Sequence, residues 1–190
     1  TEASEVNKAF LQTGVFIDRE AVEADLNKVQ ALPVAVIRNK SGDVLRLRRK
    51  EALRDNKLHE KLVIWAGGHV RSEDASNGDP IKQSLLRELQ EELRLNIEPS
   101  ELQLLGAVYS DSGGTTSKHI ALVYEWRAET DDVAITLSTA EFFERRGTSL
   151  SGKFINLKEL GKDVSEKRIQ EEWSCEIVKS LLRQDTQTLF

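Results

Sequence analysis

The segment DPIKQSLLRELQEELRL, residues 79–95, carries the pattern that decides how this chain folds. Aspartate followed by proline is a typical helix start, because the Asp79 side chain can cap the first turn and Pro80 fits its first position. Apolar residues then recur at every fourth position, with Leu86 widening the stripe: Ile81, Leu85, Leu89 and Leu93. This spacing predicts a helix that runs to about Leu95 and packs its apolar side on a core.

The opposite side of this helix is acidic. Glu88, Glu91 and Glu92 stand at positions i, i+3 and i+4, so their carboxylates emerge close together. Like charges at this spacing destabilise a helix by about 0.2–0.5 kcal/mol a pair, and Arg87, four residues before Glu91, offsets only part of that. A hard divalent cation would remove the repulsion, since Mg²⁺ prefers carboxylate, phosphate and water oxygens. The acidic face is therefore either a solvated surface or a metal platform.

The segments around the helix read as strands separated by turns. Apolar runs at 34–38 and 43–48, joined through a Ser-Gly turn, predict a hairpin, and a third run at 62–66 stops at Gly67-Gly68. Further strands are expected at 104–109, 119–126 and 154–157, and a last helix at about 165–182. Because the elements do not repeat as strand–helix–strand units, they predict an α+β fold, an α/β/α sandwich with a mixed β-sheet.

The length of 190 residues suits one domain with an extension better than two domains. We expect residues 1–30 to form an N-terminal helical extension packed on the domain. Residues 31–190 would form the domain itself, including a C-terminal helix.

The composition argues against several classes of function. A formal net charge of −5 disfavours broad binding to nucleic-acid backbones, which relies on many cationic side chains. No apolar run approaches the roughly 20 residues that span a bilayer, so no membrane association is expected. The single cysteine, Cys175, cannot form an internal disulfide, which favours a reducing compartment and hence the cytoplasm.

Together with the glycines before it, the acidic helix resembles the signature of the Nudix hydrolase family. That signature reads Gly, five residues, Glu, seven residues, then Arg-Glu-apolar-any-Glu-Glu-any-Gly-apolar. Gly68 matches its first position, Asp74 stands where the first glutamate belongs, residues 87–92 match the charged core, and Leu95 fits the closing apolar position. The resemblance implies the Nudix sandwich fold and a pyrophosphohydrolase, an enzyme that hydrolyses a phosphoanhydride bond in a nucleoside diphosphate linked to another moiety or in a related organic pyrophosphate.

The chain departs from this signature in three ways. Asp74 replaces the glutamate, unless Glu73 takes that role with a shift of one residue. Five extra residues lie between Asp74 and Arg87, and Arg94 replaces the glycine near the helix end. These departures leave an alternative open, in which the chain is a catalytically silent Nudix-like module that binds a nucleotide or metabolite.

The resemblance implies a metal site on the helix. Glu88, Glu91 and Glu92 would coordinate Mg²⁺, with Mn²⁺ as a substitute, and the carbonyl of Gly68 would add a ligand; the number of ions stays open. Arg87 would orient Glu88 or the loop acid through a charge-assisted hydrogen bond.

The general base is less narrowly defined by the resemblance. Glu88 is the first choice, and Glu141 and Glu144, in a later loop, are the alternatives. The expected catalytic residues are Glu88, Arg87 and Glu91.

Three basic or polar residues are candidates for contact with the substrate. Arg48 and Arg49 close the second strand and could bind a phosphate, and His69 stands beside the glycine pair. The expected partner is a small phosphorylated molecule derived from a nucleotide, and a homodimer is one option for the oligomeric state.

Overall fold

The computed structural model describes residues 2–50, 61–110, 116–143 and 152–187. Two compact units can be distinguished. The first comprises Thr1–Ala35, Ala66–Leu89 and Asn96–Glu125; the second comprises Val36–Trp65, Gln90–Leu95 and Trp126–Phe190. Strand β1 (Gln30–Arg38) and helix α3 (Pro80–Leu93) run from one unit into the other, so each of their residues is described with its own unit.

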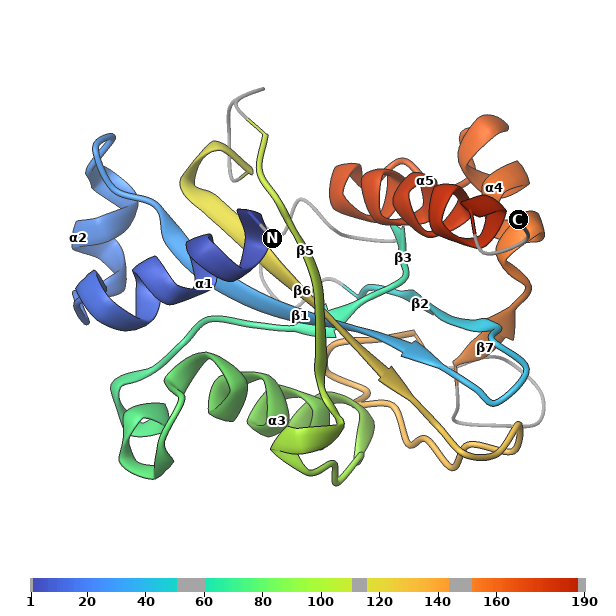
Figure 1. Cartoon of the computed structure of the whole chain (residues 1–190), viewed down its shortest axis with the longest axis horizontal. Helices are drawn as coiled ribbons and strands as arrows, with labels where there is room; N and C mark the ends of the chain where they lie inside the picture. The colour runs from blue at the N-terminus through green and yellow to red at the C-terminus, as the bar shows by residue number, and fades with distance from the viewer. Residues whose placement is uncertain (1, 51–60, 111–115, 144–151, 188–190) are drawn as a thin grey trace. The chain divides into compact units, whose positions relative to one another are not determined.

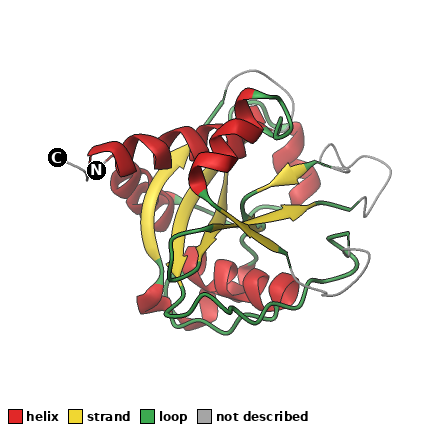
Figure 2. Cartoon of the chain, turned by 90° about the vertical axis from the view of Figure 1, so that its right-hand side faces the viewer, coloured by secondary structure: helices red, strands yellow, loops and turns green. Residues whose placement is uncertain are grey.

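The first unit begins with two helices, α1 (Glu2–Thr13) and α2 (Arg19–Ala24). The carboxylate of Asp18 caps α2 by accepting backbone N–H groups of its first turn. Helix α1 packs against strand β5 (Gln103–Val108). In Figures 1 and 2, α1 and α3 lie on opposite sides of the strands of this unit.

The strands of the first unit follow the order β1-β6-β5, with β6 spanning His119–Arg127. Strands β5 and β6 are antiparallel, and the short β4 (Ala66–Gly67) pairs antiparallel with β1. Strands β1 and β6 run in the same direction, because Gln30 lies beside His119 at their beginnings and Ala128 N donates to the Arg38 carbonyl near their ends, at 2.8 Å. The sheet is therefore mixed. Three 3₁₀ turns complete the unit: η1 (Ser72–Asn77), η2 (Pro99–Glu101) and η3 (Thr116–Lys118).

Helix α3 starts as the sequence predicts. Asp79 Oδ1 accepts the backbone N–H groups of Ile81 and Lys82, at 2.9 and 3.1 Å, and so satisfies donors that the first turn leaves free. The predicted apolar stripe is buried: Ile81, Leu85, Leu89 and Leu93. The helix ends two residues before the predicted Leu95, because Arg94 takes a left-handed conformation with φ of 57°.

The second unit is built around strand β2 (Val44–Arg48). It forms the predicted hairpin with the end of β1, where Arg38 faces Val44, and it also pairs antiparallel with β3 (Leu62–Val63) and β7 (Lys153–Ile155). The expected strand at 62–66 is thus divided into two short strands, β3 and β4.

The C-terminal part corrects the prediction of one helix at about 165–182. Two helices that pack on each other, α4 (Leu157–Ser165) and α5 (Glu172–Gln187), occupy this region. Asn156 caps the start of α4, and Lys167 has a φ of 59°, which is incompatible with a continuing helix. The Glu171 carboxylate then accepts backbone N–H groups of the first turn of α5.

The predicted fold class is confirmed: the structure combines helices with a mixed β-sheet. Among the described residues, no helix is both long enough and apolar enough to cross a membrane.

Candidate active site

The Gly67-Gly68 pair forms a turn in which a side chain on either residue would displace neighbouring atoms. Gly67 has a φ of 148°, and a Cβ on it would lie 2.3 Å from the Pro33 carbonyl oxygen. A Cβ on Gly68 would lie 2.6 Å from the carboxylate carbon of Glu88. The first glycine therefore lets the chain pass β1, and the second brings backbone against the Glu88 carboxylate.

Arg87 connects the loop and the helix in the first unit. Its Nε donates to Asp74 Oδ1 at 2.9 Å and its Nη2 to Asp74 Oδ2 at 3.1 Å. Its Nη1 donates to Glu88 Oε1 at 2.5 Å, and its Nη2 also reaches the His69 carbonyl at 3.1 Å. One guanidinium thus orients the Glu88 carboxylate and anchors both the loop acid and the residue after the glycines.

The structure distinguishes the two candidates for the loop acid. Asp74, buried in η1, accepts from Arg87 and from the backbone N–H of Arg71 at 2.8 Å. Glu73 is exposed and bonds to the neighbouring Ser72. The five extra residues follow Asp74 and lead to the helix cap, so the longer loop does not separate Asp74 from Arg87.

Charge pairing outweighs burial in this cluster. Burial alone would raise the pKa of Asp74, but the hydrogen bonds from Arg87 and from the Arg71 backbone hold that pKa below its ordinary value. Burial likewise opposes the charge on Arg87, yet the hydrogen bonds to Asp74 and Glu88 raise the pKa of Arg87. The pair is therefore ionised at neutral pH.

Sequence reasoning missed two residues of this cluster. The Ser84 hydroxyl, buried in α3, donates to the His69 carbonyl at 3.1 Å. Arg71 Nη2 lies 3.9 Å from Glu88 Oε1. Ser84 stands three residues before Arg87, on the same helix face, which is a usable signal; nothing in the sequence distinguishes Arg71 from other exposed basic residues.

The side chain of His69 contacts a second histidine, His119. Its Nε2 lies 3.0 Å from Nε2 of His119, with the rings nearly perpendicular. Burial, and after it the positive charges of Arg19 and His119, lower the pKa of His69 to about 4. His69 is thus neutral at pH 7.

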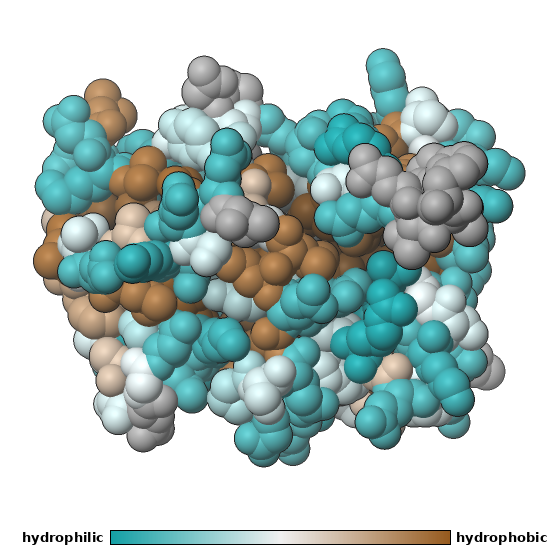
Figure 3. Space-filling view, viewed as in Figure 1, coloured by the Kyte–Doolittle hydropathy of each residue, from teal (hydrophilic) through white to brown (hydrophobic). Residues whose placement is uncertain are grey.

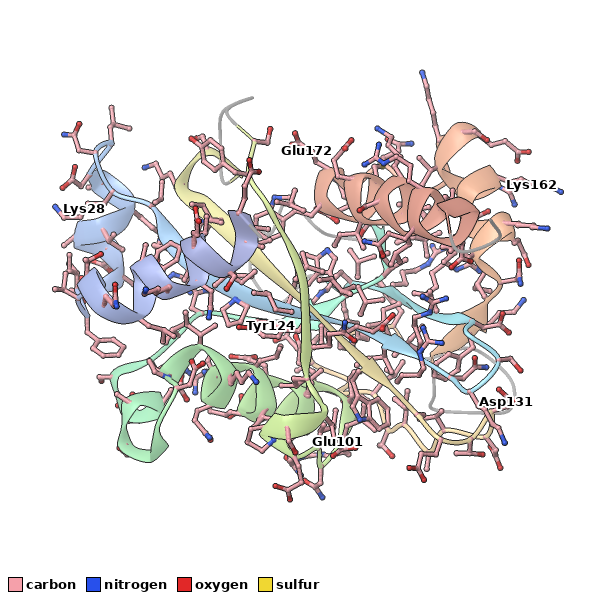
Figure 4. The ribbon with its side chains drawn as sticks, viewed as in Figure 1. Lys28, Glu101, Tyr124, Asp131, Lys162 and Glu172 are labelled. Atoms are coloured by element: carbon pink, nitrogen blue, oxygen red, sulfur yellow. The ribbon has the colours of Figure 1, made fainter. Side chains whose placement is uncertain are left out.

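A cavity of 440 Å³ in the first unit borders His69. Its apolar walls come largely from Phe10, Leu11, Val15, Phe16 and Ile17, and apolar surface gathers around α1 and α2 in Figure 3. The polar lining residues include Lys28, which follows α2 in Figure 4, as well as Gln30 and His69. The cavity suits a ligand that is partly apolar.

Arg49 occupies a buried position in the second unit. Its Nη1 donates to Glu92 Oε1 at 2.5 Å and lies 3.5 Å from Glu141 Oε2. Its guanidinium carbon lies 5.0 Å from the ring centre of Trp65 and 4.6 Å from that of Phe142. Arg49 is therefore enclosed by rings and paired with carboxylates.

Backbone pairing brings Glu141 to this place. Lys50 N donates to the Glu141 carbonyl at 2.8 Å, and Phe143 N donates to the Arg48 carbonyl at 3.1 Å. The side chain of Arg48 is exposed at the end of β2. Glu144, the other candidate base in this loop, lies outside the described residues.

The acidic residues of α3 differ in their surroundings. Glu91 is exposed, whereas Glu92 is buried with Arg49. Among the residues that the structure describes, no three His, Cys, Asp or Glu side chains are close enough together to hold a metal ion. The donor types nevertheless fit a hard cation, because all three side chains present carboxylate oxygens and Glu88 lies directly against the backbone of Gly68.

Comparison with known families identifies the family of this chain. The NUDIX domain profile matches residues 29–173, which include the glycine pair, Asp74 and the acidic helix. The chain belongs to the NUDIX family. Hydrolases of this family generally cleave derivatives of nucleoside diphosphates.

Among proteins similar in sequence to this NUDIX chain is YmaB of Bacillus subtilis (strain 168). The two are 28% identical over 167 residues, which cover 86% of this chain and 76% of YmaB.

Solved structures share the fold of this NUDIX chain at low sequence identity. Tm1382 is 22% identical with a TM-score of 0.66, and the match covers 96% of this chain and 85% of Tm1382. DR0079 of Deinococcus radiodurans is 20% identical with a TM-score of 0.59, over 79% and 81% of the two chains. The MutT protein of Methanosarcina mazei Go1 is 22% identical with a TM-score of 0.57, over 85% and 96%.

Proposed function

We propose that this protein is a divalent-metal-dependent pyrophosphohydrolase. It would cleave a phosphoanhydride bond in a nucleoside diphosphate linked to another moiety, or in a related organic pyrophosphate. The observation that carries the proposal is the Arg87 cluster, in which one guanidinium joins Asp74, Glu88 and the loop after Gly68. A solvated acidic face would have no need of a buried loop acid to hold its arginine.

In this proposal Gly68, through its carbonyl, and Glu88, Glu91 and Glu92 hold Mg²⁺, and Mn²⁺ can substitute. The ion would supply charge neutralisation at the leaving phosphate and a lower pKa for the attacking water. Glu92 would also have to exchange part of its contact with Arg49, since the structure pairs these two side chains.

The chain's own residues would divide the remaining tasks. Glu88 accepts the proton of the attacking water as general base, and Arg87 holds its carboxylate in place. Glu91 is the third catalytic residue of the proposal, beside Glu88 and Arg87. Glu141 is the second candidate for the base, because it lies beside Arg49 and its side chain is 36% exposed.

Substrate contacts belong to the proposal too. Arg48 is exposed and suited to a phosphate, and His69 borders the cavity of the first unit. Arg49 would reach a phosphate only by releasing a carboxylate partner, so we assign it the weaker role of the two arginines.

The setting of the enzyme completes the proposal. We place it in the cytoplasm, since Cys175 is the only cysteine. Residues 1–30 would act as an extension and residues 31–190 as the catalytic domain, in a monomer or a homodimer. The substrate would be a small phosphorylated molecule derived from a nucleotide.

The decisive experiment is a substrate panel. Purified protein is incubated with dinucleotide polyphosphates, nucleotide sugars and nucleoside triphosphates, each with Mg²⁺ or Mn²⁺, and product phosphates are separated and counted. We expect metal-dependent turnover of at least one class and its loss in Glu88→Gln, whereas Glu129→Gln, an exposed acid elsewhere, keeps full activity. No turnover on the whole panel would reject the enzyme.

Thermal melts separate the alternatives that then remain. Mg²⁺ should raise the melting temperature of the wild type and have a smaller effect on Glu91→Gln. We choose Glu91 over Glu92 because loss of the Glu92 charge would itself destabilise the fold through Arg49. Metal and ligand binding without turnover would indicate a silent binding module, and no response to Mg²⁺ would leave only a solvated acidic face.

A further inference from the structure

Three nitrogen-bearing side chains converge in the first unit, outside the carboxylate cluster. Nε2 of His69 lies 3.0 Å from Nε2 of His119, and Nε2 of Gln30 lies 3.2 Å from the same atom. His119 is buried, and His69 and Gln30 line the 440 Å³ cavity. We propose that His69, His119 and Gln30 form a second metal site, which takes a borderline transition-metal ion such as Zn²⁺ or Ni²⁺.

The spacing of the two rings is close to that of a coordinating pair. Imidazole nitrogens bind Zn²⁺ at about 2.0–2.1 Å in tetrahedral geometry, which places two of them roughly 3.4 Å apart. The observed separation of 3.0 Å needs a change of a few tenths of an ångström at most. The rings lie at 77° to each other, so an ion between them is not blocked by stacking.

All three residues sit on ordered parts of the fold. Gln30 and His119 begin the neighbouring strands β1 and β6. The backbone of His69 is held to α3, because its carbonyl accepts from both Arg87 and Ser84. A site built on such anchored positions loses little conformational entropy when an ion binds.

Gln30 must supply the third donor. Among the described residues no third His, Cys, Asp or Glu is placed to coordinate with the pair. The oxygen and nitrogen of the Gln30 amide are interchangeable by rotation, so its oxygen can face the ion. Glu23 adds negative charge near both rings, and Arg19, whose guanidinium bonds the Glu23 carboxylate, adds positive charge near His69.

The remaining coordination positions face the cavity. Both His69 and Gln30 border it, and most of its other lining residues have apolar side chains. An ion with open positions at such a wall accepts an oxygen or nitrogen donor of a ligand whose remainder is apolar. The donor set also separates this site from the carboxylate helix, because imidazole selects Zn²⁺, Cu²⁺ or Ni²⁺ over Mg²⁺.

Calorimetric titration with Zn²⁺ and Ni²⁺ tests the proposal on the full chain, in excess Mg²⁺ so that the carboxylates are occupied. We expect one ion to bind per chain, and His69→Gln and His119→Gln each to weaken binding by about 100-fold or more. Gln30→Glu, which places a carboxylate at the third position, should tighten binding. His59→Gln, which changes the one remaining histidine of the sequence, and Glu88→Gln should bind like the wild type.

Several outcomes would overturn the site. These are no binding to the wild type, unchanged affinity in His69→Gln, equal weakening in His59→Gln, or no gain from Gln30→Glu. Circular dichroism of each variant without metal guards against misfolding, and His69, being less buried than His119, is the safer variant. The result is independent of the proposed hydrolase, because the readout is binding and the Mg²⁺ ligands are left unchanged in the decisive variants.

Discussion

Arg87 and Asp74, thirteen residues apart, form a two-point ion pair in which Nε and Nη2 reach the two carboxylate oxygens at 2.9 and 3.1 Å. The pair closes the loop that begins at the glycine turn onto helix α3. Because the same guanidinium also bonds Glu88, the geometry of the loop is coupled to that of the first carboxylate of the helix.

Removal of the Asp74 charge should therefore destabilise the protein. Asp74→Asn keeps the shape of the side chain but loses one charge-assisted bond, and we expect a loss of about 2 kcal/mol in the free energy of unfolding. Glu73→Gln, the adjacent exposed acid, should change that free energy by less than about 0.5 kcal/mol. Urea unfolding of the wild type and the two variants measures these free energies. Equal losses in the two variants would mean that the ion pair of Asp74 with Arg87 does not stabilise the fold.

The pH dependence of this difference follows from the lowered pKa of Asp74. A carboxyl with a lower pKa in the folded than in the unfolded state contributes its full stability above its ordinary value, here 3.8, and loses it as pH falls through the folded value. The gap between wild type and Asp74→Asn should be constant near neutrality and shrink below about pH 4. Unfolding midpoints from pH 7 to pH 3 give this curve, and a gap that widened on acidification would contradict the assignment.

The two glycines of the turn should respond differently to alanine. In Gly68→Ala the new methyl group would lie against the carboxylate at the end of the Glu88 side chain, so the carboxylate must move while the fold survives. We expect a fall in turnover of about 100-fold, with a small change in melting temperature. Gly67→Ala meets the backbone of Pro33 at a positive φ, so it should lower the melting temperature strongly. A Gly68→Ala enzyme with full activity would argue against a catalytic Glu88.

Arg94→Gly should stabilise the protein. Arg94 ends α3 with a φ of 57°, a conformation that costs a residue with a side chain about 1 kcal/mol and glycine almost nothing. The lost contact to Gln90 Oε1, at 3.4 Å, is weak. Arg94→Ala removes the same contact without relieving the backbone, so it should not raise stability. Thermal melts compare the two variants. A higher melting temperature in both would mean that the positive charge of Arg94, and not its backbone conformation, lowers stability.

Glu92 and Glu91 should differ in the absence of metal. Glu92→Gln leaves the Arg49 guanidinium buried without its closest carboxylate, and we expect a loss of about 3 kcal/mol in the free energy of unfolding. Glu91→Gln changes an exposed side chain and should lower that free energy by much less. Unfolding in the presence of a chelator makes the comparison, and a stable Glu92→Gln would mean that Arg49 gains another partner.

Helix α3 shows how much of the structure can be predicted from the local sequence. Its cap at Asp79, its buried stripe and the spacing of its carboxylates all follow from a period of 3.6 residues and from the chemistry of the first turn. The strands next to it were predictable for the same reason, since alternation and turn residues act over a few positions. The helix at 157–165 was missed because it is only nine residues long, about two and a half turns, which leaves little length over which to recognise a helical period. The turn that follows it depends on a left-handed conformation at Lys167, which a lysine does not signal.

The sequence by itself determined that this chain carries a glycine turn, an acidic helix and the signature that joins them. Only the tertiary structure decided that Asp74 and not Glu73 meets Arg87, that Glu92 is paired with Arg49, forty-three residues away, and that His69 faces His119. Helical spacing fixes neighbours within one element, because the backbone there is regular. Contacts between distant segments depend on how whole elements pack, and the local sequence of this loop does not encode whether Glu73 or Asp74 turns inward.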